Sequence, residues 1–364
     1  MGEHRGGDRH EGPTVVYIVG LGRSGSTLLE RMLGAVPGFG NFGELNALFS
    51  RVSAQDQRCG CGEPFATCPF WQTVGSHAFG GWQEVTSRVA ELQPGLIRQR
   101  FIPYLLAPRI APDGYRRRLE EYVGVHERLY AGLARASGAD VIVDASKSAA
   151  QLFALRHIDG LDLRVLNLVR DPRGVAHSWS KTDIEMPNVR DGEARMRTYS
   201  PHRAALLWSA LQLESSLLQR LASHSGRLRY EDLVAHPREA LAAALDAIGL
   251  PPRPGWLDHV HAHSVMLGST HGVAGSRFRF TTGSIDLRLD DAWRSSMPAQ
   301  SRRSVSALTL PQLLTHHYVG HYVGHAAHKA DHAGRLRGSG DQGTSPAGAP
   351  AAPLPSQPGN ITTP

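Results

Sequence analysis

The strongest structural signal in the chain is residues 14–30, TVVYIVGLGRSGSTLLE. Its first part, Thr14–Gly20, is a β-branched apolar run of the length expected for a buried strand. Apolar side chains at helical spacing then occupy Ser26–Val36. The glycines between these segments let the backbone curl and turn successive N–H groups inward, and the start of the helix adds its dipole. The stretch therefore predicts a strand, a phosphate-binding loop and a helix.

The rest of the chain continues the alternation of strand and helix. Short apolar runs predict further strands at Val141–Asp144, Leu163–Val169 and Leu228–Tyr230. Amphipathic stretches predict helices at Tyr115–Ala136, Ser148–His157 and His202–Ser223. Pro37–Gly43 is typical of a turn. This order predicts an α/β, P-loop-like fold, in which helices cover both faces of a central, mostly parallel sheet.

Two inserts and two tails interrupt or flank this pattern. We expect a flexible tail over residues 1–13, a single domain over 14–330 and a disordered Pro/Gly-rich tail over 331–364. The first insert, Gln72–Pro112, has helical periodicity broken by three prolines. The second, Thr182–Pro201, is polar and aperiodic. Because it begins near the predicted phosphate site, it is either a lid over a ligand or a disordered excursion.

Composition excludes several classes of protein. Hydrophobic residues make up 41% of the 364, enough for a sizeable core, so the chain is not disordered throughout. No run is long enough to span a membrane, and the N-terminus has no apolar signal segment, so we expect a cytoplasmic protein. The net charge of +6 suits anionic ligands. The arginines form no run, which argues against nucleic acid as a partner.

The phosphate-binding loop departs from the Walker A pattern at one position. Gly20, Gly25 and Thr27 occupy the positions that this motif requires. Ser26 stands where Walker A has its lysine, and Arg23 supplies a cation earlier in the loop. A glycine-rich turn without a ligand is the alternative, and the strand–loop–helix setting argues against it.

Four segments together resemble a known family. Residues 23–29, RSGSTLL, resemble the 5′-phosphosulfate loop of sulfotransferases that use 3′-phosphoadenosine-5′-phosphosulfate (PAPS), in the branch similar to tyrosylprotein and carbohydrate sulfotransferases. Leu168–Ser178, LVRDPRGVAHS, resembles the 3′-phosphate motif of that family. Arg229–Val234 resembles its R-Y-E-D-L segment, and His271–Trp293 resembles the C-terminal segment of bacterial members. The resemblance covers roughly Val15–Tyr322.

The resemblance implies where PAPS would bind. The loop N–H groups and the hydroxyls of Ser26 and Thr27 would hold the 5′-phosphate, and Arg170 would pair with the 3′-phosphate. Ser178 would donate to the same phosphate, with His177 and Arg173 nearby in support. The expected nucleotide-binding residues are Arg23, Ser24, Gly25, Ser26, Thr27, Arg170, Ser178 and Tyr230.

The resemblance also implies the catalytic residues. Glu44, in Phe-Gly-Glu, would take the proton of the acceptor hydroxyl; its alternative role is a carboxylate stabilised at a helix start. Lys147 would stabilise the bridging oxygen, and Arg23 would reach the leaving phosphate and the sulfuryl oxygens. If Glu44 is not the base, His77 or Asp144 is next. No metal is required, because fixed cations can stabilise the spread charge.

The histidine and cysteine patterns are less informative. Cys59, Cys61 and Cys68 form C-x-C-x6-C, and His77 could complete four metal ligands. The one-residue gap is atypical for zinc, so the pattern favours free or buried thiols, with a disulfide and a zinc site left open. Bacterial sulfotransferases with a similar segment place it on the acceptor side. The histidines of residues 316–332 recur at helical spacing and are typical of a solvated helix face.

The sequence thus predicts an enzyme, a PAPS-dependent sulfotransferase that acts on a hydroxyl of a carbohydrate, a lipid or a small metabolite. It predicts no stable membrane insertion and leaves a homodimer open. Two alternatives remain: a P-loop kinase or NTPase with Val141–Asp144 as its Walker B strand, and a catalytically inactive nucleotide-binding protein. The acceptor cannot be named, because its specificity would lie in the two inserts.

Overall fold

The structure, a computed structural model, describes residues 12–182 and 197–319. The chain divides into two compact units at His316, and all elements given below belong to the first unit. Residues 183–196 of the predicted lid fall outside the described residues, as do residues 320–332 of the histidine-rich segment and the whole Pro/Gly-rich tail.

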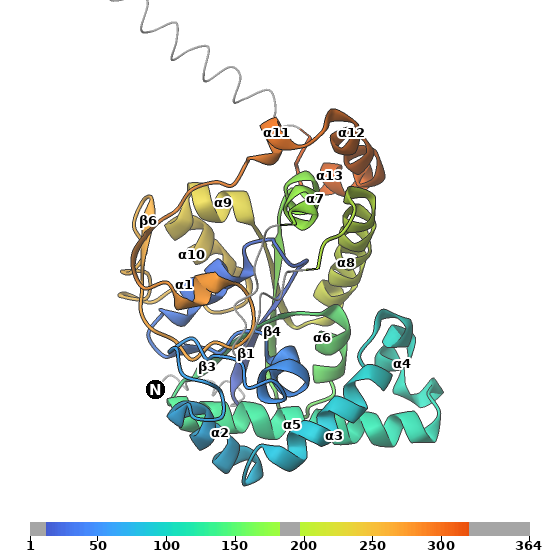
Figure 1. Cartoon of the computed structure of the whole chain (residues 1–364), viewed down its shortest axis with the longest axis vertical. Coiled ribbons are helices and arrows are strands. Elements are labelled where there is room, and N and C mark those ends of the chain that lie inside the picture. Colours follow the sequence, from blue (N-terminus) through green and yellow to red (C-terminus); the bar gives the residue numbers. More distant parts are fainter. Residues whose placement is uncertain (1–11, 183–196, 320–364) are drawn as a thin grey trace, which may run out of the picture. The chain divides into compact units, whose positions relative to one another are not determined.

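A five-stranded sheet in the order β2-β3-β1-β4-β5 forms the centre of the fold (Figure 1). Its strands are β1 (Thr14–Val19), β2 (Phe39–Asn41), β3 (Val141–Lys147), β4 (Asp162–Val169) and β5 (His224–Arg229). Every neighbouring pair in this sheet is parallel, which confirms the predicted α/β class. A separate antiparallel pair consists of β6 (Ser264–Leu267) and β7 (Gly283–Asp286).

Helices cover both faces of the sheet. The helices are α1 (Ser26–Gly34), α2 (Pro69–Phe79), α3 (Gln83–Leu92), α4 (Ile102–Leu106), α5 (Asp113–Ser137), α6 (Ala149–Leu155), α7 (Pro172–Ser180), α8 (Pro201–Leu221), α9 (Tyr230–Ala235), α10 (Pro237–Ala247), α11 (Trp293–Ser296), α12 (Ala299–Leu308) and α13 (Leu310–Thr315). Val15, Tyr17 and Val19 of β1 share one apolar cluster with α5, α6 and α8. Val16 and Ile18 share the opposite cluster with α1 and α10. The strand is therefore buried on both sides, which explains its uninterrupted apolar sequence.

Two details of the predicted elements were wrong. The predicted turn Pro37–Gly43 contains the short edge strand β2, which pairs with β3 from Phe39 opposite Val141. Three residues are too few to show strand periodicity in a sequence. The last predicted strand, Leu228–Tyr230, is the end of β5, and Tyr230 already begins α9. The polar start of β5 concealed it, because an edge strand does not need apolar residues on both faces.

Prolines in the first insert begin helical segments rather than only breaking them. Pro103 stands in the first turn of α4, and Pro94 and Pro108 stand in the first turns of short 3₁₀ helices. This position tolerates proline because the N–H that proline lacks would have no partner within the helix. The helical periodicity predicted for this insert is confirmed by α2, α3 and α4.

The parallel sheet brings the candidate residues to one edge. The glycine loop follows β1, Glu44 follows β2, Lys147 ends β3, Arg170 follows β4 and Tyr230 follows β5. The carboxyl ends of parallel strands lie at the same edge, where ligands of open α/β sheets bind. None of the described helices is both long and apolar enough to cross a bilayer.

The packing of α1 generates the first testable prediction. Leu29 is fully buried in the cluster that joins α1 to the sheet, whereas Leu206 on α8 is 58% exposed. We expect Leu29→Ala to lower the free energy of unfolding by about 2–5 kcal/mol, because it leaves a cavity. Leu206→Ala is the control and should change it by less than about 0.5 kcal/mol. Urea unfolding of the three proteins measures this, and equal stabilities would contradict the packing.

Candidate active site

The loop between β1 and α1 packs closely against the segments that follow β4 and β5. Arg23 and Gly25 both have positive φ, 75° and 90°. A Cβ at Gly25 would lie 2.5 Å from the ring of Tyr230, and one at Gly20 would lie 2.6 Å from the carbonyl oxygen of Leu168. Both contacts are too short for any side chain, so the two glycines are required by close approach of the neighbouring segments.

Polar atoms in this loop are buried without partners. The hydroxyl of Ser24 and the Nε of Arg23 make no hydrogen bond within the described part of the chain. Burial, followed by the nearby charge of Arg170, lowers the pKa of the Arg23 guanidinium. Leaving such groups unpaired costs free energy unless a ligand satisfies them. The loop thus presents two buried donors that have no partner among the described residues. The assignment of Ser24, Gly25, Ser26 and Thr27 to a phosphate stays a prediction.

Arg170 lies against the same loop. Its guanidinium donates to the carbonyl oxygen of Arg23 at 2.9 Å and stacks over the ring of Tyr230 at 4.6 Å. It also donates to the backbone oxygen of Asp290 at 2.7 Å and to the carboxylate of Asp290 at 2.9 Å. The side chain of Arg170 is 7% exposed and that of Asp290 is 45% exposed. A buried guanidinium is thus neutralised by one carboxylate that solvent can reach.

Helix α7 connects to the loop through a residue that the sequence analysis missed. Trp179 donates from its indole N–H to the carbonyl oxygen of Gly22 at 2.9 Å. Ser178, the predicted phosphate ligand, is half-buried one position earlier on α7. The Arg173 guanidinium is already hydrogen-bonded to Asp171, the N-cap of the helix, so it shapes the start of α7.

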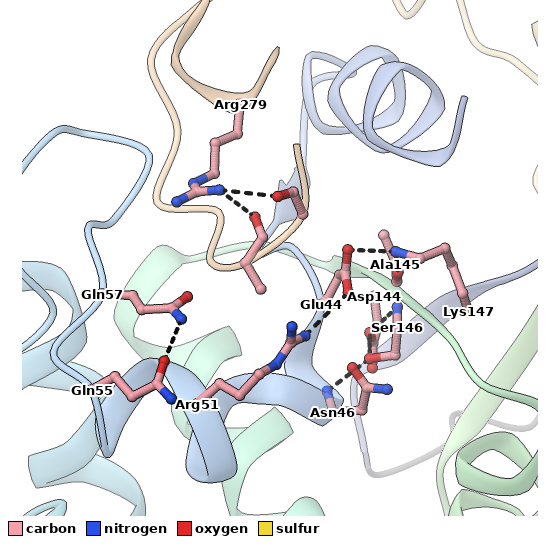
Figure 2. A network of polar contacts seen from close by, with 12 residues as sticks. Glu44, Asn46, Arg51, Gln55, Gln57, Asp144, Ala145, Ser146, Lys147 and Arg279 are labelled. Atoms are coloured by element: carbon pink, nitrogen blue, oxygen red, sulfur yellow. Dashed lines mark hydrogen bonds and ion pairs between the residues drawn. The ribbon is translucent and has the colours of Figure 1, made fainter. Parts of the chain in front are cut away.

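Glu44 and Lys147 form an ion pair at the same edge (Figure 2). The lysine Nζ lies 2.5 Å from Oε1 of Glu44, and Arg51 approaches Oε2 at 3.7 Å. Glu44 precedes a short 3₁₀ helix, but its side chain makes no capping hydrogen bond. Its carboxylate is therefore engaged by cations rather than by a helix start. Lys147 has a φ of 66°, which is uncommon for any residue other than glycine. Such strained backbone conformations are often found at functional sites.

Glu44 also lies next to the start of α1. A Cβ placed on Gly275 would be 3.4 Å from Oε1 of Glu44 and 3.5 Å from Oγ1 of Thr27. The two side chains thus flank the same glycine. The structure brings the predicted base, Lys147 and the predicted phosphate loop together, although these residues come from three different strand ends.

A buried carboxylate on α1 positions this region and was missed by the sequence analysis. Glu30 accepts hydrogen bonds from the backbone N–H of Gly43 at 2.7 Å and from the side chain of Asn41 at 3.2 Å. Burial raises the pKa of the Glu30 carboxyl to about 7. The neighbouring Arg31 donates to the carbonyl oxygens of Gly268, Phe278 and Thr281. The available signal was a Glu-Arg pair inside an otherwise apolar helix.

The two reserve candidates for the base have other surroundings. Asp144 is buried and accepts hydrogen bonds from Ser146 (Figure 2). It also accepts one from the hydroxyl of Tyr130. Burial raises the pKa of the Asp144 carboxyl to about 6. Both of its carboxylate oxygens accept hydrogen bonds from the protein's own donors. Asp144 therefore stabilises the region around β3 and is less suited to take a proton from a substrate hydroxyl. His77 is exposed on α2.

Comparison with known proteins now identifies the class. The model of the sulfotransferase family matches residues 13–254, and the chain belongs to this family. No curated protein sequence matches the chain.

Twelve chains of solved structures match this one, among them the following three. The sulfotransferase domain of the Synechococcus PCC 7002 olefin synthase is 20% identical, with 83% of this chain and 95% of that chain covered and a TM-score of 0.44. The sulfotransferase domain of the curacin biosynthetic pathway is 15% identical over 82% and 98% of the two chains, with a TM-score of 0.41. A sulfotransferase of Mycobacterium tuberculosis is 15% identical over 66% and 69%, with a TM-score of 0.37.

Glu30 generates a prediction about pH. Its raised pKa means that between about pH 4.5, the ordinary value, and pH 7 the folded state binds more protons than the unfolded state. The contribution of Glu30 to the free energy of unfolding therefore falls as the pH rises, by up to about 3 kcal/mol. Glu30→Gln keeps an acceptor for Gly43 but cannot ionise. We expect the variant to gain stability over wild type from pH 5 to pH 8. Urea unfolding at four pH values measures the difference, and parallel curves would reject the interpretation.

Proposed function

We propose that the chain transfers a sulfuryl group from PAPS to a hydroxyl of a carbohydrate, a lipid or a small metabolite, with Glu44 as the general base. The observation that carries this proposal is the Glu44–Lys147 ion pair beside Thr27 of the glycine loop. Sulfuryl transfer needs a proton acceptor for the attacking hydroxyl and cations for the leaving phosphate. These groups meet at one edge of the sheet, in a chain of the sulfotransferase family.

The loop residues would hold the 5′-phosphosulfate. The unpartnered hydroxyl of Ser24 and the backbone around Gly25 are available to its oxygens. Because α1 begins at Ser26, the first N–H groups of the helix also point at this position. Arg23 would place its charge on the sulfuryl oxygens and the leaving phosphate. PAPS, when bound, supplies the sulfuryl group and a phosphate leaving group.

Arg170 would bind the 3′-phosphate. It is buried, stacked on Tyr230 and linked to the loop through the carbonyl oxygen of Arg23. A phosphate would take the place that the carboxylate of Asp290 holds on the guanidinium. The exchange replaces one charge-assisted contact by another, and the bidentate geometry of arginine favours phosphate.

Glu44 and Lys147 would have separate roles in the transfer reaction. Lys147 would move its ammonium from the carboxylate to the bridging oxygen, whose negative charge grows as the bond to sulfur breaks. Glu44 would then accept the proton of the acceptor hydroxyl as that oxygen attacks sulfur. The ion pair thus keeps both groups within reach of the reaction before the substrates arrive.

The two alternatives fit the same residues less well. A P-loop kinase requires a lysine where the chain has Ser26. An inactive nucleotide-binding protein has no need for a paired Glu44 and Lys147 at this position. Thermal unfolding with 3′,5′-ADP in the absence of metal, compared with ATP and Mg²⁺, separates a sulfotransferase from a kinase. Incubation with ³⁵S-labelled PAPS and a pool of hydroxyl acceptors then tests transfer itself.

The phosphate-binding role of Arg170 generates the third prediction. Arg170→Ala should weaken binding of 3′,5′-ADP by about 2–4 kcal/mol and of adenosine 5′-monophosphate much less, because only the first ligand has a 3′-phosphate. Asp290→Asn is the matched comparison and should tighten 3′,5′-ADP, since it removes the competing carboxylate. Isothermal titration calorimetry measures all pairs. Equal losses for both nucleotides in Arg170→Ala would refute the assignment.

The fourth prediction concerns the base. Glu44→Gln keeps the shape of the side chain and removes the proton acceptor, so turnover should fall by roughly 10²–10⁴ while PAPS affinity changes little. Glu239→Gln, on the exposed surface of α10, is the control and should retain full turnover. Steady-state transfer from PAPS measures both variants. A Glu44→Gln enzyme with wild-type turnover would place the base elsewhere.

A further inference from the structure

A cluster of three thiols and one imidazole lies outside the residues used above. The sulfur atoms of Cys59, Cys61 and Cys68 and a ring nitrogen of His271 all lie within 4.8 Å of one another. Cys68 and His271 are 203 positions apart in the chain. His77, the fourth ligand that the sequence suggested, is not a member of this group.

Three of the six distances among these four atoms match those of a tetrahedral metal site. The sulfurs of Cys61 and Cys68 are 3.7 Å apart, and Nδ1 of His271 lies 3.5 Å from the sulfurs of both Cys59 and Cys68. Around a tetrahedral zinc ion, two thiolate sulfurs lie about 3.8 Å apart, and a sulfur and an imidazole nitrogen lie about 3.6 Å apart. A disulfide would instead require about 2.05 Å between two sulfurs.

The surroundings hold the ligands in place. Cys68 is the N-cap of α2, so its sulfur is held at the start of that helix. The Trp71 indole donates to the backbone oxygen of His271 at 3.0 Å, and the Phe70 ring stacks on the imidazole at 4.4 Å. Contacts that fix the orientation of an imidazole in this way are the support that a metal-binding histidine needs.

We propose that Cys59, Cys61, Cys68 and His271 bind one structural zinc ion. Three soft thiolates and an imidazole in tetrahedral arrangement select zinc among the common divalent metals. All four positions are filled by protein ligands, which is the mark of a structural rather than a catalytic site. Binding releases the thiol protons that remain, because zinc takes the thiolate form.

The zinc site would fasten the C-terminal segment that supports Glu44. The backbone N–H of Gly60 donates to the carbonyl oxygen of Gly272 at 2.9 Å, directly beside the ligands. One residue further, Val273 accepts the backbone N–H of Glu44 at 3.0 Å. His271 thus joins the loop of residues 59–68 to the backbone contact between Val273 and Glu44. The ion acts through these backbone contacts and touches no residue assigned to substrate.

Metal analysis of the intact chain tests the proposal. The chain is purified through a tag without histidines, and its metals are quantified by inductively coupled plasma mass spectrometry. We expect about one zinc per chain. His271→Ala should lower the zinc content at least tenfold. His77→Ala is the matched control, because it removes an exposed histidine near the same cysteines, and it should keep the full content.

Thiol counting separates zinc from a disulfide and does not depend on the variants. The chain has three cysteines, all in the cluster. After denaturation with a chelator and without reductant, the zinc proposal expects three alkylated thiols by mass spectrometry, and a disulfide leaves one. A metal-free wild type, iron or copper in place of zinc, one alkylated thiol, or a His271→Ala protein that retains its zinc would each overturn the proposal. Loss of transfer activity alone would not bear on it.

Discussion

Parallel pairing of all five central strands is the constraint on which the site depends. It directs every carboxyl end to one edge of the sheet, so that each strand delivers its next residue to the same region. Each strand contributes one part: the loop after β1, Glu44 after β2, Lys147 on β3, Arg170 after β4 and Tyr230 after β5. The sheet topology therefore brings these residues to one edge, although they are far apart in the sequence.

The irregular segments around this edge need donors and acceptors of their own. Buried backbone groups that belong to no helix or sheet must still form hydrogen bonds. Two consecutive residues of α1 meet this need: Glu30 accepts the N–H of Gly43, and Arg31 donates to three carbonyl oxygens of the segment between β6 and β7. A single helix thus continues from the end of the predicted phosphate loop and carries two polar anchors on its face.

The parts that follow directly from a strand could be predicted from the sequence. The glycine loop, Lys147 and Arg170 stand immediately after apolar runs, and their local spacing is enough to suggest their place. His271 and Asp290 could not be assigned, because they reach their partners through loops that close only in the folded chain. Strand β2 was missed because three residues show no period, and Glu30 was missed because a charge within a helix is usually exposed.

The carboxylate of Asp290 on Arg170 has a consequence for the proposed binding of a phosphate at this arginine. Any anion that enters must displace a tethered competitor that never diffuses away, so its apparent affinity is lowered by the fraction of time the pair is closed. The same carboxylate returns as the anion leaves and again neutralises the charge of the buried guanidinium. The anion is thereby bound less tightly and leaves faster. Faster release benefits any enzyme whose cycle is limited by the departure of a charged product.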